Sequence, residues 1–164
     1  MNIKNLHNKF LQCNSIIDID SRSIRKGSMF FAIKGENFDG NNFAIEALKK
    51  GASTAVIDSK DKKFENIKNV IQVENSLEAL QKLANYHRNK TKSKIIALTG
   101  SNGKTTSKEL IHLVLKEKFN TISTLGNFNN HIGVPLSLLQ IKEDTEFSVI
   151  ELGANNFGEI DLLT

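Results

Sequence analysis

The fold class of this 164-residue chain is decided by the segment Ile95-Ile96-Ala97-Leu98-Thr99-Gly100-Ser101-Asn102-Gly103-Lys104-Thr105-Thr106. The apolar run 95–98 predicts a buried strand that leads into a glycine-containing turn, and a helix predicted to end near Lys118 follows at once. Gly100 and Gly103 allow backbone amides to approach a phosphate without an intervening Cβ atom, and the helix adds its positive N-terminal end. The segment therefore predicts a phosphate-binding loop between a strand and a helix.

The positions of this loop have expected roles in nucleotide binding. Lys104 would hold the β- and γ-phosphates of ATP, and the Thr105 hydroxyl would ligate Mg²⁺. The usual motif has four residues between its glycines, but Leu98 stands where the first glycine would be, so the match is to a shorter Gly-x-x-Gly-Lys-Thr form. The alternative is a strand–helix turn that binds nothing. The expected ATP-binding residues are Gly100, Ser101, Asn102, Gly103, Lys104, Thr105 and Thr106.

A carboxylate is expected near the loop. Glu151 follows the apolar residues 147–150 and precedes the flexible Gly153. Ligands of open α/β sheets collect at the carboxyl ends of the strands, and a carboxylate there could bind Mg²⁺ directly or through water. We therefore predict Lys104 and Glu151 as catalytic residues, and Thr105 and Glu151 as metal ligands. The alternative for Glu151 is a strand-end carboxylate exposed to solvent.

Strands and helices alternate along the second half of the chain. Pro135 suits the first turn of a helix, because proline loses no hydrogen bond there. The alternation predicts a parallel sheet with helices on its faces. The other elements expected here are a strand at 121–124, a helix through 139, a strand at 147–152 and a helix over 158–163.

The first half of the chain has the pattern of a separate α/β unit. The expected elements are a short opening helix, strands at 15–20, 29–34, 54–58 and 69–73, and a helix over 41–50 that Gly51 stops. Asn75 or Ser76 can cap the next helix, which runs to about Asn89. We therefore predict an α/β fold with a small N-terminal α/β domain, residues 1–75. A P-loop-type parallel-sheet ATPase domain follows, residues 76–164.

Composition excludes several other classes of protein. The net charge of +4, from 22 basic and 18 acidic residues, is low for a nucleic-acid surface but suits phosphorylated ligands. No apolar run approaches the ~20 residues of a membrane span, and the N-terminus lacks the apolar middle of a signal peptide. Cys13 is the only cysteine, so no intramolecular disulfide can form. We expect a cytoplasmic protein without membrane insertion or nucleic-acid binding.

Several motifs, in order, resemble the Mur ligases of peptidoglycan synthesis. Residues 99–106 are similar to that family's ATP loop, which uses the shorter spacing. Asp20-Ser21-Arg22 with the segment 27–40 resembles the UDP-sugar-binding domain of two members. Residues 126–136 and 151–160 look like the member that adds D-alanyl-D-alanine more than the one that adds the third amino acid. The resemblance covers nearly the whole chain.

This resemblance implies ATP-dependent amide-bond synthesis. The terminal carboxylate of UDP-N-acetylmuramoyl-tripeptide would attack the γ-phosphate of ATP to give an acyl phosphate, which the amine of D-alanyl-D-alanine then attacks. Residues 1–75 would be the UDP-sugar-peptide-binding substrate domain. The implied substrate-binding residues are Ser21, Arg22, Lys34 and Gly35 near the uridine diphosphate, and Asn129 and Asn130 facing the γ-phosphate and the acyl group.

The same residues have simpler explanations. Asp20-Ser21-Arg22 could be a turn with a capping hydroxyl, and the asparagines could satisfy backbone groups of their own loop. His131 stands where the family often has an acidic residue, so the resemblance gives it no role. Three further histidines lie on predicted helices and are expected to be surface or packing residues: His7, His87 and His112.

The resemblance also leads to an expectation about turnover. Mur ligases have three domains and the similarity ends within the second, the ATPase domain, of which only the first part is matched. We therefore expect no ligase turnover from these 164 residues alone, and a monomeric full-length protein. Steady phosphate release dependent on ATP and the dipeptide would contradict the first expectation.

Two other functions stay open. One is another ligase of the superfamily, such as the tripeptide-forming enzyme or a folate polyglutamate synthase. The other is a nucleotide-binding module without catalysis. The pattern over 20–40 argues against the folate enzyme, which lacks that unit, and Glu151 argues against the non-catalytic module.

Overall fold

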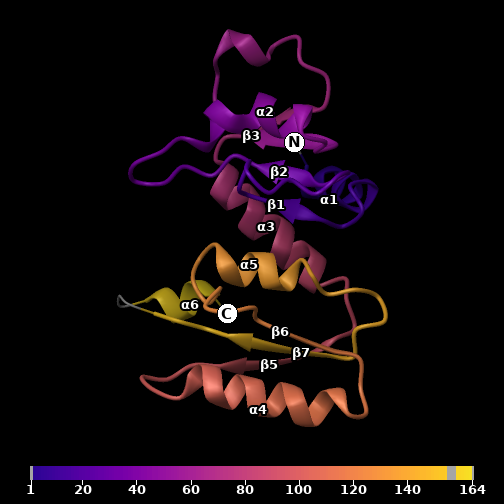
Figure 1. The fold of residues 1–164 in the computed structure, drawn as a ribbon, viewed down its shortest axis with the longest axis vertical. Coiled ribbons are helices and arrows are strands. Elements are labelled where there is room, and N and C mark those ends of the chain that lie inside the picture. The colour runs from indigo at the N-terminus through magenta and orange to yellow at the C-terminus, as the bar shows by residue number, and fades with distance from the viewer. Residues whose placement is uncertain (1, 155–157, 164) are drawn as a thin grey trace. The chain divides into compact units, whose positions relative to one another are not determined.

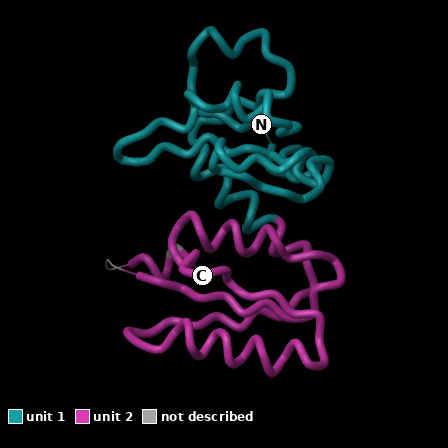
Figure 2. The backbone as a smooth tube through the Cα atoms, in the orientation of Figure 1, with its two compact units in different colours: residues 1–86 teal, residues 87–164 magenta. Residues whose placement is uncertain are grey.

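The computed structural model describes residues 2–154 and 158–163. The backbone divides into two compact units, residues 1–86 and 87–164 (Figure 2). This division falls inside helix α3 (Ser76–Arg88), whereas the sequence placed the domain boundary before that helix, at 75/76. Within the first unit, the ring of Tyr86 from α3 contacts the ring of His7, with 5.1 Å between centroids. The extents of the functional domains stay a prediction.

The first unit is an α/β unit with the four strands that the sequence predicted, and these form one parallel sheet. The strand order is β1-β2-β3-β4, and every pair is parallel. The expected helix over 41–50 begins as a 3₁₀ turn, which the Asp39 side chain caps by accepting a hydrogen bond from the Asn41 amide. The elements before α3 are α1 (Ile3–Gln12), β1 (Ile17–Asp18), β2 (Met29–Phe31), η1 (Gly40–Phe43), α2 (Ala44–Lys49), β3 (Thr54–Ile57), η2 (Lys62–Phe64) and β4 (Val70–Gln72).

The core of the first unit lies between the sheet and α2. Small residues of α2, Ala44 and Ala47, are fully buried and allow the helix to approach the strands closely. Phe30 of β2 and Ile57 of β3 fill the space beneath it. Cys13 is also fully buried, with its Sγ 3.5 Å from the Thr54 hydroxyl.

The second unit has a three-stranded parallel sheet in the order β5-β7-β6. Figure 1 shows α4 on one side of this sheet and α5 on the other. Val134 of α5 packs with Ile150 and Leu152 from β7 and the residue after it. The elements are β5 (Lys94–Leu98), α4 (Lys104–Lys116), β6 (Thr121–Ser123), α5 (Gly133–Leu138), β7 (Phe147–Glu151) and α6 (Glu159–Leu163).

One expectation about this sheet was wrong. The apolar run 95–98 was expected to be a buried strand, but β5 is partly exposed along its whole length. The reason is its place at the edge of the three-stranded sheet, whereas the central strand β7 is buried from Ser148 to Glu151. The register pairs Leu98 with Glu151, so the phosphate loop and Glu151 leave the sheet side by side.

None of the helices in the described ranges combines the length and the apolar character that a membrane crossing requires.

Candidate phosphate and metal site

The phosphate loop presents an uncapped helix start. Gly103 has φ +74°, a left-handed conformation that favours glycine, and an added Cβ atom there would meet nothing within 4 Å. Helix α4 begins at Lys104, and no side chain caps it. The first amides of a helix have no intrahelical partner, so those at the start of α4 can bind an anion. The Lys104 ammonium bends back over the loop and donates a hydrogen bond to the Gly100 carbonyl.

Glu151 joins this loop to the rest of the unit. Its side chain is 2% exposed, so it is not the solvent-exposed carboxylate that the sequence left as an alternative. One carboxylate oxygen accepts from the Thr105 hydroxyl at 3.0 Å, and the other accepts from the Asn129 amide at 2.9 Å. The Glu151 backbone amide donates to the Thr124 hydroxyl at 3.0 Å. The structure therefore brings together Thr105, Asn129 and Glu151, which were selected on separate motifs.

The spacing of these oxygens suits Mg²⁺. Two neighbouring ligands of an octahedral Mg²⁺ at about 2.0–2.1 Å lie roughly 2.9 Å apart. Thr105 Oγ1 and Glu151 Oε2 are 3.0 Å apart, which is the length of the hydrogen bond between them and is also compatible with that ligand spacing. Among the described residues, no three His, Cys, Asp or Glu side chains cluster in a way that could hold a metal alone. A hydroxyl and one carboxylate therefore suit a cation whose other ligands are water and phosphate, as Mg²⁺ prefers.

Asn130 has a different place from Asn129. Its side-chain oxygen accepts from the amides of Ile132 and Gly133, at 3.1 and 2.8 Å, at the entry to α5. The oxygen is thus used to order its own loop, which was the simpler explanation considered from the sequence. His131, next to it, is exposed.

The residues selected in the first unit follow neighbouring strands. Ser21 and Arg22 come after β1, and Lys34 and Gly35 come after β2, so both pairs lie beyond the carboxyl edge of the same parallel sheet. Arg22 makes a two-pronged contact with Asp20, at 2.9 and 2.7 Å. Hydrogen bonds from the side chain and backbone of Arg22 lower the pKa of Asp20 to about 2.

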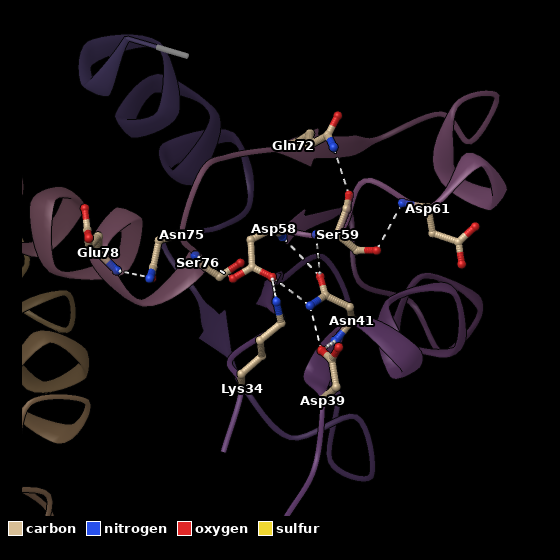
Figure 3. Close-up of polar contacts among 10 residues, drawn as sticks. All are labelled: Lys34, Asp39, Asn41, Asp58, Ser59, Asp61, Gln72, Asn75, Ser76 and Glu78. Atoms are coloured by element: carbon tan, nitrogen blue, oxygen red, sulfur yellow. Dashed lines mark hydrogen bonds and ion pairs between the residues drawn. The ribbon is translucent and has the colours of Figure 1, made fainter. Parts of the chain in front are cut away.

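Lys34 belongs to a polar network centred on Asp58 (Figure 3). Its ammonium lies 2.9 Å from Asp58 Oδ1, and this contact raises the pKa of Lys34. Burial alone would raise the pKa of Asp58, but hydrogen bonds from Lys34, Asn41 and the Ser76 amide outweigh burial and leave it below the ordinary value. Asn41 is 2% exposed and links Asp58 to Asp39.

The sequence interpretation missed Lys108. This side chain of α4 is fully buried, and its ammonium donates to the Thr124 carbonyl at 2.7 Å. A signal was present, because Lys108 lies at helical spacing between Lys104 and Ile111, on a stripe with Leu115 that faces the sheet.

Of the three histidines expected to be surface or packing residues, His7 and His87 are packing residues. His7 is buried against Phe10 and Tyr86, and His87 places Nε2 2.8 Å from the Ile141 carbonyl. Their contacts are those of packing residues.

A parallel α/β sheet with an uncapped helix start after its first strand, and an acidic strand end beside that loop, is the arrangement of a P-loop-type α/β domain. The family follows from comparison. Residues 15–88 match the family model described as Mur ligase family, catalytic domain, and residues 98–164 match the Mur ligase middle domain. The chain belongs to the Mur ligase family.

Several proteins similar to this chain are ligases of this family. A UDP-N-acetylmuramoyl-tripeptide–D-alanyl-D-alanine ligase of Rickettsia prowazekii is 42% identical over 93% of this chain and 33% of its own length. The corresponding Acinetobacter baumannii ligase has a solved structure with a TM-score of 0.81 at 38% identity, covering 90% of this chain and 32% of its own. The structure of a MurF ligase from Thermotoga maritima, solved in complex with ADP, has a TM-score of 0.78 at 35% identity. It covers 91% of this chain and 34% of its own. The chain spans about a third of these relatives.

Proposed function

We propose that this protein acts in ATP-dependent amide-bond synthesis, joining D-alanyl-D-alanine to UDP-N-acetylmuramoyl-tripeptide. The observation that carries the proposal is the contact of Glu151 with Thr105 beside the uncapped start of α4. It is supported by similarity to relatives that bear this activity in their names, at about 40% identity over most of the chain. Both nucleotide substrates favour a cytoplasmic location.

The proposed reaction has two steps. A carboxylate oxygen of the tripeptide attacks the γ-phosphorus of ATP, ADP leaves, and an acyl phosphate forms. The dipeptide amine then attacks the acyl carbon, inorganic phosphate leaves, and the nitrogen loses a proton. Negative charge lies on the phosphoryl group as it is transferred in the first step and on the phosphate as it leaves in the second, so catalysis depends on positioning and charge neutralisation.

The residues of the second unit have corresponding roles. The amides at the start of α4 and the Lys104 ammonium would bind the phosphates, for which Lys104 must turn from the Gly100 carbonyl toward the ligand. Thr105 and Glu151 would hold Mg²⁺, which supplies further charge neutralisation when bound. Asn129, already in contact with Glu151, would orient that carboxylate. Asn130 would contribute to the site indirectly, through the loop that its side chain orders.

The first unit would bind the sugar nucleotide. Ser21, Arg22, Lys34 and Gly35 would lie near its uridine diphosphate, since all four follow the carboxyl ends of adjacent parallel strands. Arg22 and Lys34 are the cationic members, with side chains 86% and 52% exposed. Their ammonium and guanidinium groups are therefore within reach of a ligand in solution.

Calorimetry on the 164-residue chain tests the proposal. We expect ADP to bind more tightly with Mg²⁺ than without it, and UDP-N-acetylmuramoyl-tripeptide to bind more tightly than the dipeptide form. Lys104→Met is the matched variant and should weaken ADP binding without changing the tripeptide titration. A folded chain that binds neither nucleotide would contradict the proposal. A preference for the dipeptide form would instead identify a tripeptide-forming ligase.

A further inference from the structure

Lys108 places a positive charge in the interior of the second unit. The side chain is fully buried, and its ammonium has three acceptors around it. These are the carbonyls of Thr124 at 2.7 Å and Gly126 at 3.4 Å, and a Glu109 carboxylate oxygen at 3.0 Å. A lysine ammonium has three donors, so the set is complete. Burying such a charge is unfavourable unless it is paired in this way. The complete pairing therefore indicates that Lys108 has a specific role in the unit.

The two carbonyls belong to the segment between β6 and Asn129. We call residues 124–129 the asparagine loop. At its start, the Thr124 hydroxyl accepts from the Glu151 amide. At its end, the Asn129 carbonyl accepts from the Gly153 amide at 2.7 Å, and its side chain donates to Glu151. Lys108 therefore fixes the near part of a loop whose far end contacts the proposed metal ligand.

Packing does little to hold this loop. Its two large apolar side chains, Leu125 and Phe128, are 58% and 46% exposed. Residues 125–128 are all in the exposed class. The course of the loop is set by hydrogen bonds at Thr124, Gly126 and Asn129, with the turn that the Phe128 amide closes on Leu125 and the close approach of the Phe128 backbone to Gly133, rather than by buried side chains.

We propose that Lys108 is a positioning residue for the nucleotide site. Its ammonium ties the asparagine loop to α4, the same helix whose first turn carries Lys104 and Thr105, and so holds the Asn129 amide against Glu151. Lys108 touches neither the phosphate nor the metal; it acts through Thr124 and Gly126. The part that concerns Mg²⁺ rests on the function proposed above, but the tethering of the loop does not.

The test compares Lys108→Met with Glu109→Gln, which alters only the half-exposed partner of the ammonium. In the chain without nucleotide, Lys108→Met should speed amide hydrogen exchange over 125–130 about tenfold or more, with residues 147–150 of β7 unchanged. It should also reduce the gain in ADP affinity that Mg²⁺ gives, while leaving Mg²⁺-free ADP binding at its wild-type value. Glu109→Gln should change neither measurement by more than about twofold.

The outcomes separate this inference from the proposed function. If the wild-type chain binds no ADP, the proposed function fails, and the exchange measurement still decides the role of Lys108. If Lys108→Met does not fold, Lys108→Arg takes its place, because arginine keeps the charge but its larger fork must displace the loop. Unchanged exchange over 125–130 in a folded variant would overturn the inference. Loss of fold in both variants would overturn it too, because Lys108 would then support the whole unit.

Discussion

Two carboxylates at the carboxyl ends of parallel strands, Asp58 in the first unit and Glu151 in the second, differ in their partners. Asp58 is paired with the Lys34 ammonium at 2.9 Å. Glu151 is more deeply buried, yet its partners are the neutral Thr105 and Asn129 side chains. Among the ion pairs of the described residues, none involves Glu151.

The difference indicates which carboxylate is structural and which is available for a ligand. A buried charge is unfavourable unless a counter-charge or several donors compensate it. Asp58 has its counter-charge within the protein, so it needs nothing from solution. Glu151 has donors but no cation, so a divalent ion bound there would supply the missing charge. We therefore interpret Asp58 as part of the framework that orients Lys34, and Glu151 as a metal ligand.

Replacing Glu151 should give the largest effect. We expect Glu151→Gln to lower Mg²⁺-dependent ADP affinity about 100-fold, since even groups that merely support a metal ligand are worth about 10–100-fold. Glutamine keeps the shape and can still contact Thr105, so the free energy of unfolding should stay within about 1 kcal/mol of wild type. Calorimetry with and without Mg²⁺, together with urea unfolding, measures both. Undiminished Mg²⁺ dependence would remove the distinction between the two carboxylates.

The equivalent change in the first unit should act on stability instead. Asp58→Asn removes the partner of Lys34 and weakens the contacts with Asn41 and Ser76. We expect a loss of about 1–2 kcal/mol in the free energy of unfolding, with ADP affinity unchanged. Urea unfolding followed by circular dichroism measures the first quantity and calorimetry the second. A variant as stable as wild type would show that the Asp58 network is not part of the framework.

Acidity should weaken the first unit through its lowered carboxyl pKa values. A carboxyl whose folded pKa lies below its unfolded value stabilises the fold above the unfolded pKa, and that contribution is lost as pH falls through the folded pKa. Asp20, with a pKa of about 2, and Asp58, also lowered, both follow this rule. Stability should therefore decline from about pH 4 toward pH 2, and less steeply in Asp58→Asn. Chemical unfolding at stepped pH checks this; equal slopes in both proteins would contradict it.

A smaller effect is expected where Asn129 meets Glu151. An added Cβ atom at Gly153 would lie 2.7 Å from Asn129 Cγ, so the asparagine side chain must move. We expect Gly153→Ala to weaken Mg²⁺-dependent ADP binding about fivefold, the value of roughly one hydrogen bond. Asn129→Ala is the matched control, because the two changes should not add if they act on the same contact. Fully additive losses would show that Gly153 acts elsewhere.

Local patterns in the sequence were sufficient for much of the fold. The strand and helix of the phosphate loop follow from apolar periodicity and from Gly103, and the proximity of Glu151 follows from the geometry of parallel sheets. Both parallel sheets have the predicted strands. The exposure of β5 could not be predicted, because strand order depends on contacts between distant segments rather than on the strand's own residues.

The remaining parts of the site depend on loops and on buried polar side chains. Residues 124–130 show no periodic pattern in the sequence. The contact of Asn129 with Glu151, and the different place of Asn130, therefore could not be predicted from it. Lys108 was overlooked because a lysine in a helix is usually solvated. The network around Asn41 was missed for a similar reason, since an amide beside a predicted turn has many local partners.

The distinction between the two carboxylates is tested most directly by replacing Mg²⁺ with Mn²⁺, a paramagnetic ion of similar ligand preference. With ADP present, amide resonances of the ¹⁵N-labelled chain would be recorded during a Mn²⁺ titration. We expect broadening at Thr105, Asn129 and Gly153, which surround Glu151, at lower Mn²⁺ concentrations than at Lys34 or Ser76, which adjoin Asp58. Early broadening around Asp58, with the Glu151 neighbourhood unaffected, would contradict this interpretation.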